Sequence, residues 1–249
     1  MHYEIIDISY ATVTELYQLW DEKYEGVALN KLKGFQRPWI FKQIKKYFPN
    51  LKDKNILSVG EGLDKSAKML SEQYFAIVCV LDKYENDEKL DLTRYRGGIV
   101  LKDLEKENPT IKYVNGIAGE PLYHQIGDGI FDCIYSNSVL EHIPRDKLMG
   151  VFLDIDRMLK VDGIQVHTID IPVDRDEPLN IFINFLSDVI HPNQIHKLKE
   201  IDQNRIKIDP MTFYETCEIF KLYWFPNKNR KDVQFERWTS LNLVLKKAK

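Results

Sequence analysis

Apolar, β-rich runs alternate along this chain with segments of helical spacing, and this alternation strongly limits the possible folds. The extended runs are residues 55–60, 75–82, 111–116, 131–138 and 164–170, and helical patterns occupy residues 64–73 and 145–161. Such strand–helix–strand units predict a parallel sheet that is covered by helices on both faces. We therefore expect an α/β fold.

Both ends of the chain extend this core. Residues 10–24 and 36–48 have helical spacing, and Pro38 suits the first turn of the second helix, so residues 1–50 are expected to form an N-terminal helical cap on a domain of residues 51–249. Near the C-terminus, residues 219–225 and 241–247 look like two further strands at an antiparallel edge.

The composition excludes several functional classes. With 249 residues, of which 44% are apolar, the chain can bury one substantial core. A net charge of −3 with interspersed Lys and Glu provides no basic surface, so nucleic acid is not an expected partner. The acidic N-terminus is unlike a signal peptide, and the longest apolar run, residues 75–81, is too short to span a bilayer. The expected location is the cytoplasm.

The cysteines agree with a reducing compartment. Cys79, Cys133 and Cys217 are widely separated and form no C-x-x-C pair, and two of them lie in apolar runs that resemble strands. This spacing favours free thiols over disulfides or a zinc site.

A glycine-rich turn follows the first apolar run. Gly60 and Gly62 flank Glu61, and glycines allow backbone amides to approach a ligand closely. The turn lacks the third glycine of a dinucleotide fingerprint, because Lys65 stands there, and it has no phosphate-loop Gly-Lys-Ser or Gly-Lys-Thr. The turn therefore suits a ligand without an essential phosphate, or it is an ordinary strand–turn–helix connection.

The ends of the other predicted strands carry polar residues. Asp82 ends the second strand, 22 positions after Gly60, as suits an acid that binds a ribose diol, although such a residue also commonly ends a strand at a turn. The third, fourth and fifth strands end in residues 115–120, 136–143 and 167–174. Ligands of such sheets bind at these carboxyl ends.

Taken together, these segments resemble the class I S-adenosylmethionine-dependent methyltransferases from about residue 50 to the C-terminus. Residues 56–62 resemble the family's first glycine motif, Asp82 its ribose-binding acid, residues 131–143 its fourth-strand motif, and residues 157–169 its entry into strand five. The resemblance implies a seven-stranded, mostly parallel Rossmann-like sheet with an antiparallel C-terminal strand.

The resemblance also implies S-adenosylmethionine as cofactor, with S-adenosylhomocysteine as product. The implied cofactor-binding residues are Ser58, Gly60, Glu61, Gly62, Asp82, Lys83, Gly116, Ile117, Ala118, Ser136, Asn137 and Ser138. Three positions depart from the family pattern, because Ser58 and Ile117 replace acids and Asp64 replaces the third glycine. These departures leave open a second interpretation, a catalytically silent protein that only binds the cofactor.

Methyl transfer to a hydroxyl needs a base. Asp170, His142 and His167 lie at or near strand ends and are the candidate catalytic residues, with His167 placed last. Strand alternation puts His167 and Asp170 on opposite faces, so a direct pair is not expected. His142 as a structural helix-start residue and His167 as a core histidine remain the alternatives. No group of residues has convincing metal-ligand spacing, so no metal is expected.

The acceptor region should be residues 172–215, a long insertion with helical patterns that we expect to form a lid. Its aromatic residues either line the acceptor pocket or form the lid's own core. The insertion resembles, with low specificity, bacterial methyltransferases of surface polysaccharides or their precursors. The expected partner is therefore a sugar, sugar nucleotide or phosphorylated sugar, and the chain is expected to be a homodimer. Oxygen or nitrogen methylation of another small metabolite is the alternative.

Overall fold

The computed structural model describes residues 3–29, 31–60, 65–85, 89–90, 101–120, 125–174, 177–201, 206–207, 209–216 and 237–248. In chain order, its elements are β1 (Tyr3–Tyr10), α1 (Val13–Asp21), α2 (Leu32–Tyr47), β2 (Asn55–Val59), α3 (Ser66–Glu72), β3 (Ile77–Asp82), β4 (Tyr84–Glu85), β5 (Lys89–Leu90), α4 (Leu101–Glu107), β6 (Ile111–Asn115), β7 (Phe131–Asn137), η1 (Leu140–His142), α5 (Arg145–Met158), β8 (Leu159–Pro172), α6 (Glu177–Val189), η2 (Pro192–Gln194), α7 (Ile195–Leu198), β9 (Glu215–Thr216) and β10 (Arg237–Lys247).

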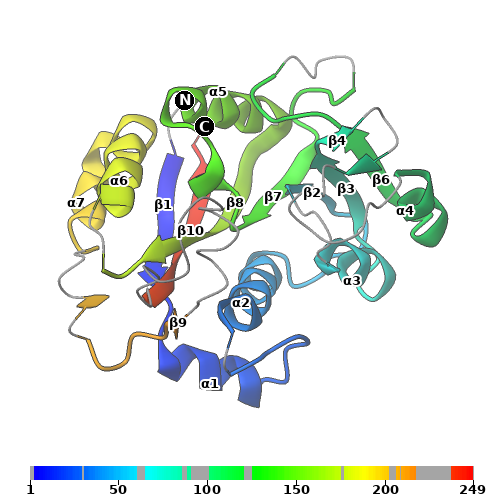
Figure 1. Ribbon diagram of the computed structural model, residues 1–249. Helices are drawn as coiled ribbons and strands as arrows, with labels where there is room; N and C mark the ends of the chain where they lie inside the picture. The colour runs from blue at the N-terminus through cyan, green and yellow to red at the C-terminus, as the bar shows by residue number, and fades with distance from the viewer. Residues whose placement is uncertain are drawn as a thin grey trace, which may run out of the picture.

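A twisted sheet forms the centre of the molecule (Figure 1). Its main path runs β1-β10-β8-β7-β2-β3-β6, and the short strand β9 pairs with β10. Strands β8, β7, β2, β3 and β6 are mutually parallel, whereas β10 is antiparallel to both of its neighbours β8 and β1. The predicted seven-stranded sheet with a reversed C-terminal strand is thus confirmed. Residues 241–247 lie in β10, and the predicted strand at 219–225 lies outside the described residues.

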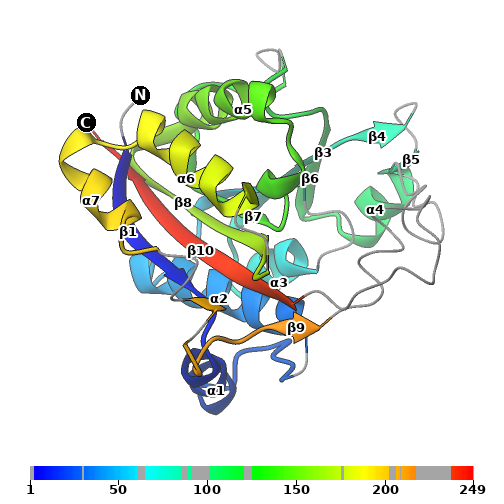
Figure 2. The ribbon, with the colours of Figure 1, turned by 60° about the vertical axis from the view of Figure 1, so that its left-hand side comes forward.

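Helices cover both faces of the sheet (Figure 2). On one face, α5, α6 and α7 bury residues such as Phe152, Leu186 and Leu198 against β1, β8 and β10. On the other face, α1, α2 and α3 bury residues such as Trp39 and Leu70 against β2, β3 and β8. Each large apolar side chain that leaves water in this way contributes about 1.5–3 kcal/mol. The buried Cys79 and Cys133 are free thiols, as predicted, and Cys217 lies outside the described residues.

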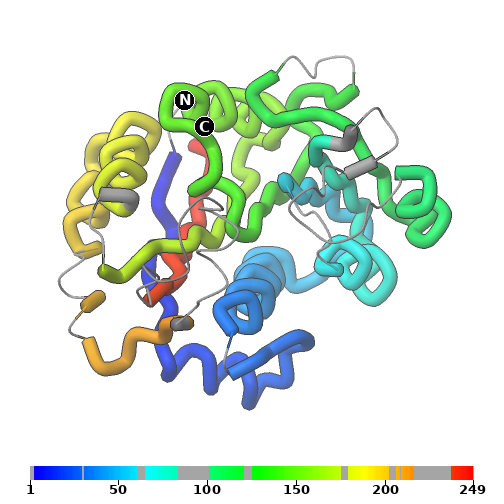
Figure 3. The backbone as a smooth tube through the Cα atoms, viewed as in Figure 1, coloured from blue at the N-terminus to red at the C-terminus, as the bar shows by residue number. Residues whose placement is uncertain are grey.

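The N-terminal segment contains the two predicted helices, α1 and α2, and also a strand that was not predicted. Strand β1 lies at the edge of the main sheet and pairs with β10 from Tyr3 opposite Lys247 to Tyr10 opposite Leu241. This pairing brings the two ends of the chain together (Figure 3). On the other side of β1, the backbone N–H of Ile5 donates to Gln194 Oε1 at 2.5 Å. Lys197 Nζ donates to the carbonyl of Ile5 at 2.6 Å. These side chains cover an edge that would otherwise be open to another strand.

Pro38 does not begin α2, as the sequence predicted, but lies inside it, because the helix already starts at Leu32. Proline has no N–H, so the carbonyl of Gly34 loses its partner within the helix. The backbone N–H of Ala28 donates to that carbonyl instead, at 3.3 Å. An added Cβ on Gly34 would lie 2.5 Å from the Cβ of Ala28. The loop before α2 therefore packs directly on the helix. Its hydrogen bond to the carbonyl of Gly34 allows the helix to contain Pro38.

The described part of the 172–215 insertion packs on the sheet. In α6, Phe182 and Phe185 are buried in the same apolar cluster as α5, and the rings of Phe185 and Phe152 are 4.8 Å apart. These aromatic residues therefore belong to the main core of the domain. Farther along, Glu215 Oε2 accepts a hydrogen bond from the backbone N–H of Leu32 at 2.8 Å. The insertion is thereby tied to the start of α2, and its role as a lid remains a prediction.

Candidate active site

The turn after β2 is tightly packed against the segment that follows β7. Gly60 has a φ of +68°, and an added Cβ would lie 2.8 Å from both methyl carbons of Val139. Its N–H donates to the carbonyl of Leu81 at 2.8 Å, which ties the turn to β3. A residue with a side chain would both strain this backbone and collide with Val139. Glu61 and Gly62 lie outside the described residues.

Ser58 is buried inside β2, two residues before Gly60. The residue is 1% exposed, and its Oγ has no hydrogen-bond partner among the residues that the structure describes. A small hydroxyl therefore stands where the family has an acid, and this hydroxyl can still form a hydrogen bond.

The ends of β3 and β6 meet beside this turn. The backbone N–H of Gly116 donates to the carbonyl of Asp82 at 2.9 Å. One carboxylate oxygen of Asp82 accepts from the backbone N–H of Lys83 at 2.7 Å. Ile117 is 39% exposed, whereas Ala118 is buried. The chain thus presents a carboxylate and an exposed apolar side chain next to each other.

The three polar residues at the end of β7 have different surroundings. Ser136 Oγ is buried and lies 2.7 Å from His167 Nδ1, and Asn137 Oδ1 accepts from Thr168 Oγ1 at 3.0 Å. Ser138 has a φ of +53°, an uncommon conformation for a residue with a side chain. Its hydroxyl lies 2.7 Å from Asp170 Oδ1 and 3.0 Å from Gln36 Oε1. Ser138 therefore points away from the glycine turn and toward β8 and α2.

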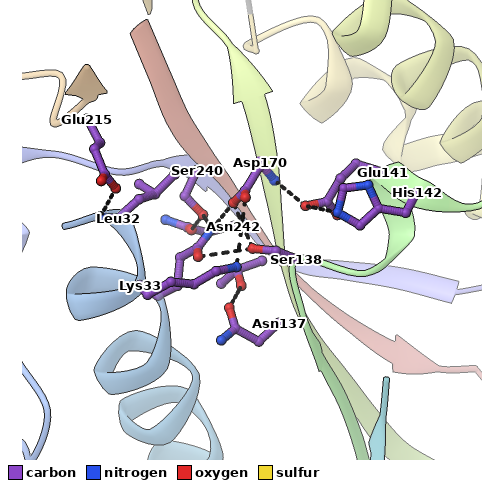
Figure 4. Close-up of polar contacts among 12 residues, drawn as sticks. Leu32, Lys33, Asn137, Ser138, Glu141, His142, Asp170, Glu215, Ser240 and Asn242 are labelled. Carbon is purple, nitrogen blue, oxygen red and sulfur yellow. Dashed lines mark hydrogen bonds and ion pairs between the residues drawn. The ribbon is translucent and has the colours of Figure 1, made fainter. Parts of the chain in front are cut away.

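Asp170 is the centre of a buried polar cluster in which β7, β8, β10 and α2 meet (Figure 4). It is 3% exposed, and its Oδ1 accepts from Gln36 Nε2 at 2.6 Å as well as from Ser138. Gln36 Nε2 also lies 3.2 Å from Ser240 Oγ. Lys33 Nζ is 3.8 Å from Asp170 Oδ2, and its side chain remains 38% exposed. Donors therefore surround this carboxylate and stabilise its charge.

Glu141 follows β7 and lies beside Asp170. Its Oε1 accepts the backbone N–H of Asp170 at 3.0 Å and is 3.9 Å from His142 Nε2. Burial raises the pKa of Glu141 to about 8, with a further contribution from the charge of Asp170 and an opposing one from Lys33. The His142 side chain is 33% exposed at the same strand end. Two carboxylates thus share one small region, and one of them titrates near neutral pH.

His167 lies away from this cluster, on the opposite face of β8, as the strand alternation predicts. It is fully buried, with its Nε2 2.9 Å from Gln165 Oε1 and its ring 6.2 Å from that of Phe152. Burial lowers the pKa of His167 to about 3, so the ring stays neutral at ordinary pH. These surroundings favour the alternative of a core histidine, and a catalytic role for His167 rests on the sequence alone.

Four residues of the cluster were not predicted from the sequence: Lys33, Gln36, Glu141 and Ser240. Gln36 had a usable signal, because it is a polar residue on a helix face that is otherwise apolar and buried. Glu141 stands beside His142 in a segment that was noted for its polar residues. Lys33 and Ser240 had no local signal, since the fold alone brings α2 and β10 to β8.

Comparison with known proteins adds a family to this geometry. Residues 57–166 match the family model described as "Methyltransferase domain". Residues 57–166 are thus similar to a methyltransferase domain, as the resemblance to the class I S-adenosylmethionine-dependent methyltransferases predicts. A search of curated proteins found no match.

Two solved structures share the fold of this methyltransferase. One, from Galdieria sulphuraria, is assigned as a sarcosine dimethylglycine methyltransferase and has 14% identity and a TM-score of 0.51, over 93% of this chain and 96% of that one. The other is the YcgJ protein from Bacillus subtilis, with 10% identity and a TM-score of 0.52, over 85% of this chain and 99% of that one. At such low identities the likeness concerns the fold.

The strand ends suit S-adenosylmethionine, the cofactor of this family. Asp82 offers a carboxylate for a ribose diol, and Ile117 offers an apolar surface for the purine. The unpartnered hydroxyl of Ser58 is free to bond a group of the ligand or a water. The residues present therefore fit the cofactor in kind.

Neither a metal site nor a membrane helix is found in the part of the chain that the structure describes. Among these residues, no group of three or more His, Cys, Asp or Glu side chains is placed to hold a metal ion. None of the described helices is long and apolar enough to cross a bilayer.

Proposed function

We propose that this methyltransferase transfers the methyl group of S-adenosylmethionine to a hydroxyl of a small polar acceptor, a sugar or a sugar phosphate. The observation that carries the proposal is the polar cluster around Asp170, which joins a carboxylate, an amide and two hydroxyls at the carboxyl ends of β7 and β8. Such groups bind the hydroxyls of sugars by directional hydrogen bonds. The exposed ammonium of Lys33 beside them suits a phosphate on the acceptor.

The residues divide into two sets. The proposed cofactor set is Ser58, Gly60, Glu61, Gly62, Asp82, Lys83, Gly116, Ile117, Ala118, Ser136, Asn137 and Ser138. Within it, Ser136 and Ser138 form contacts with residues of β8. The cofactor supplies an electrophilic methyl group. The chain then has to orient the acceptor and remove its hydroxyl proton, and orientation alone can lower the barrier by about 7–11 kcal/mol. The sequence proposes Asp170 and His142 as the proton acceptors, and the structure adds Glu141, which contacts both of them.

The biological setting extends the proposal further. A sugar, sugar nucleotide or phosphorylated sugar as acceptor places the reaction in the assembly of surface polysaccharides. Such precursors are made in the cytoplasm, where we place the enzyme, and the proposed assembly is a homodimer. This part of the proposal rests on the resemblance of residues 172–215 and on the polar character of the cluster.

A second candidate function is a catalytically silent, cofactor-binding subunit. Ser58 favours it, because a buried hydroxyl stands where the family has an acid and finds no partner. Methylation of an oxygen or nitrogen of another small metabolite is a further alternative within the enzyme class.

A single panel of acceptors separates these functions. Purified protein is incubated with labelled S-adenosylmethionine and sugar nucleotides, phosphorylated sugars, free sugars and the amine sarcosine, and the products are identified by mass spectrometry. A methylated sugar hydroxyl is the expected product. Methylated sarcosine without any methylated sugar would replace the proposal by N-methylation. Tight cofactor binding by calorimetry without turnover of any acceptor would favour the silent subunit.

A further inference from the structure

Glu141 has one carboxylate oxygen without a partner among the residues that the structure describes. Its Oε1 accepts the backbone N–H of Asp170 at 3.0 Å, whereas its Oε2 is buried and forms no hydrogen bond with this part of the chain. The side chain as a whole is 12% exposed, so it lies just beneath the surface at the end of β7. A buried acceptor without a donor is costly, and in native proteins it commonly marks a functional group or a place for a ligand or water.

Asp170, the carboxylate beside Glu141, is instead surrounded by hydrogen-bond donors. Gln36 Nε2 and Ser138 Oγ both bond its Oδ1, and Lys33 Nζ is the nearest cation to its Oδ2. Two donors therefore already occupy Asp170 Oδ1. Of the two carboxylates, Glu141 is therefore the one with an oxygen left for a substrate proton.

The groups that face Glu141 also affect its titration. Asp170 from β8 raises the pKa of Glu141 by its charge, after the larger effect of burial, and Lys33 from α2 lowers it. His142 from the same short helix lies 3.9 Å away. The resulting pKa, about 8, is close to the working pH that favours general base catalysis.

We propose that Glu141 accepts the hydroxyl proton of the methyl acceptor, while the backbone N–H of Asp170 holds its carboxylate in place. This inference rests on the proposed O-methylation. As the bond between the acceptor oxygen and the methyl carbon forms, the methyl–sulfur bond breaks and its electron pair stays on sulfur. The proton of the hydroxyl moves to Glu141 Oε2. S-adenosylhomocysteine, the methyl ether and protonated Glu141 are the products of the step, and the proton then returns to solvent.

The main test is Glu141→Gln, which keeps the size and polarity of the side chain but cannot accept the proton. We expect kcat to fall by about 10²- to 10⁴-fold with unchanged cofactor affinity by calorimetry. In the wild type, log kcat/KM should rise with pH and level off near pH 8, and the variant should lack this step. Glu107→Gln, which changes an exposed carboxylate on α4, is the matched control and should behave as the wild type. A loss below tenfold, or an unchanged pH profile, would overturn the proposal.

A second variant and a spectroscopic measurement keep the proposal testable if Glu141→Gln does not fold correctly. Glu141→Asp keeps a carboxylate and should retain a pH-dependent step with reduced turnover. Infrared difference spectra between the wild type and Glu141→Gln, recorded without acceptor, should show one protonated carboxyl in the wild type at pH 6 that ionises around pH 8. A carboxyl that stays protonated at pH 9 contradicts the proposal, because a protonated Glu141 cannot accept the substrate proton.

The two levels of the proposal fail differently. If hydroxyl acceptors are methylated equally by the wild type and Glu141→Gln, O-methylation stands and the role of Glu141 falls. If the wild type methylates amines and no hydroxyl, the proposed function falls and takes the role of Glu141 with it.

Discussion

The cofactor side and the acceptor side of this methyltransferase are built in different ways. On the proposed cofactor side, the described candidate residues lie at or near the ends of parallel strands, and the carboxylate of Asp82 accepts a hydrogen bond from its sequence neighbour Lys83. On the acceptor side, Asp170 is bonded by Gln36 and Ser138, which are 134 and 32 positions away in the sequence. One side is thus encoded locally, and the other is encoded by the fold.

The largest effect is expected at the glycine turn. Gly60→Ala should abolish measurable cofactor binding, because the added Cβ meets two methyl carbons of Val139 at 2.8 Å and the φ of +68° is strained for alanine. Gly129→Ala is the matched control, since that glycine has a φ of +61° but nothing within 4 Å of an added Cβ. Calorimetry and thermal unfolding of both variants separate the collision from the backbone strain. Equal behaviour of the two would mean that the packing against Val139 is unimportant.

The next effect concerns the acceptor side and pH. Folded wild-type protein keeps the proton of Glu141 up to about pH 8, whereas the unfolded chain releases it near pH 4.5, so this group makes stability fall as pH rises between these values. Glu141→Gln removes that loss. The stability of the variant relative to the wild type should therefore increase by about 2–4 kcal/mol from pH 5 to pH 9 in urea unfolding. A pH-independent difference would show that Glu141 is ionised throughout.

A smaller loss is expected for the ribose-binding acid. Asp82→Ala should weaken cofactor binding by about 1–3 kcal/mol, the cost of losing hydrogen bonds to a charged acceptor, without changing the stability of the fold. Asp103→Ala on α4, also an exposed carboxylate, should bind the cofactor as the wild type does. Calorimetric titration of both proteins is the measurement. Unchanged affinity of Asp82→Ala would remove the acid from the cofactor site.

Gln36→Leu tests whether a change at the proposed acceptor side leaves cofactor binding unaffected. It removes three contacts of Asp170's cluster, to Asp170, Ser240 and Ser138, and we expect turnover to fall about tenfold while cofactor affinity stays constant. Gln43→Leu in the same helix is the control, because Gln43 is also buried but its Oε1 has no partner. If Gln36→Leu instead weakens cofactor binding, the two sides are not separate.

The smallest effect is expected from chelation. EDTA should change neither cofactor affinity nor turnover, since the described residues hold no metal-ligand group. Loss of turnover with EDTA and its recovery with magnesium would reassign Asp170 and Asp174 as metal ligands.

The same contrast explains how far sequence reasoning could reach. The sheet, its reversed last strand and the positions of Gly60 and Asp82 at strand ends were predictable, because periodicity and turn residues act over a few positions. Strand β1 was missed although Tyr3 and Ile5 alternate with exposed residues, a signal that was present but short. Pro38 was misplaced because the loop residue Ala28, and not the helix, satisfies the carbonyl of Gly34. The neighbours of Asp170 depend on α2 and β10 packing on β8, which no local pattern encodes.

The pairing of β1 with β10 has a consequence for how the chain is made. A ribosome makes β1 long before the strand that flanks it, because Tyr3 pairs with Lys247. Until then β1 has no partner in the sheet, and its apolar residues Tyr3 and Ile5 cannot take their final buried positions. Contacts of such long sequence separation close slowly and expose unpaired strands in the meantime. The sheet is therefore complete only once β10 has been made, and until then the nascent chain is open to chaperones, proteases and misassembly.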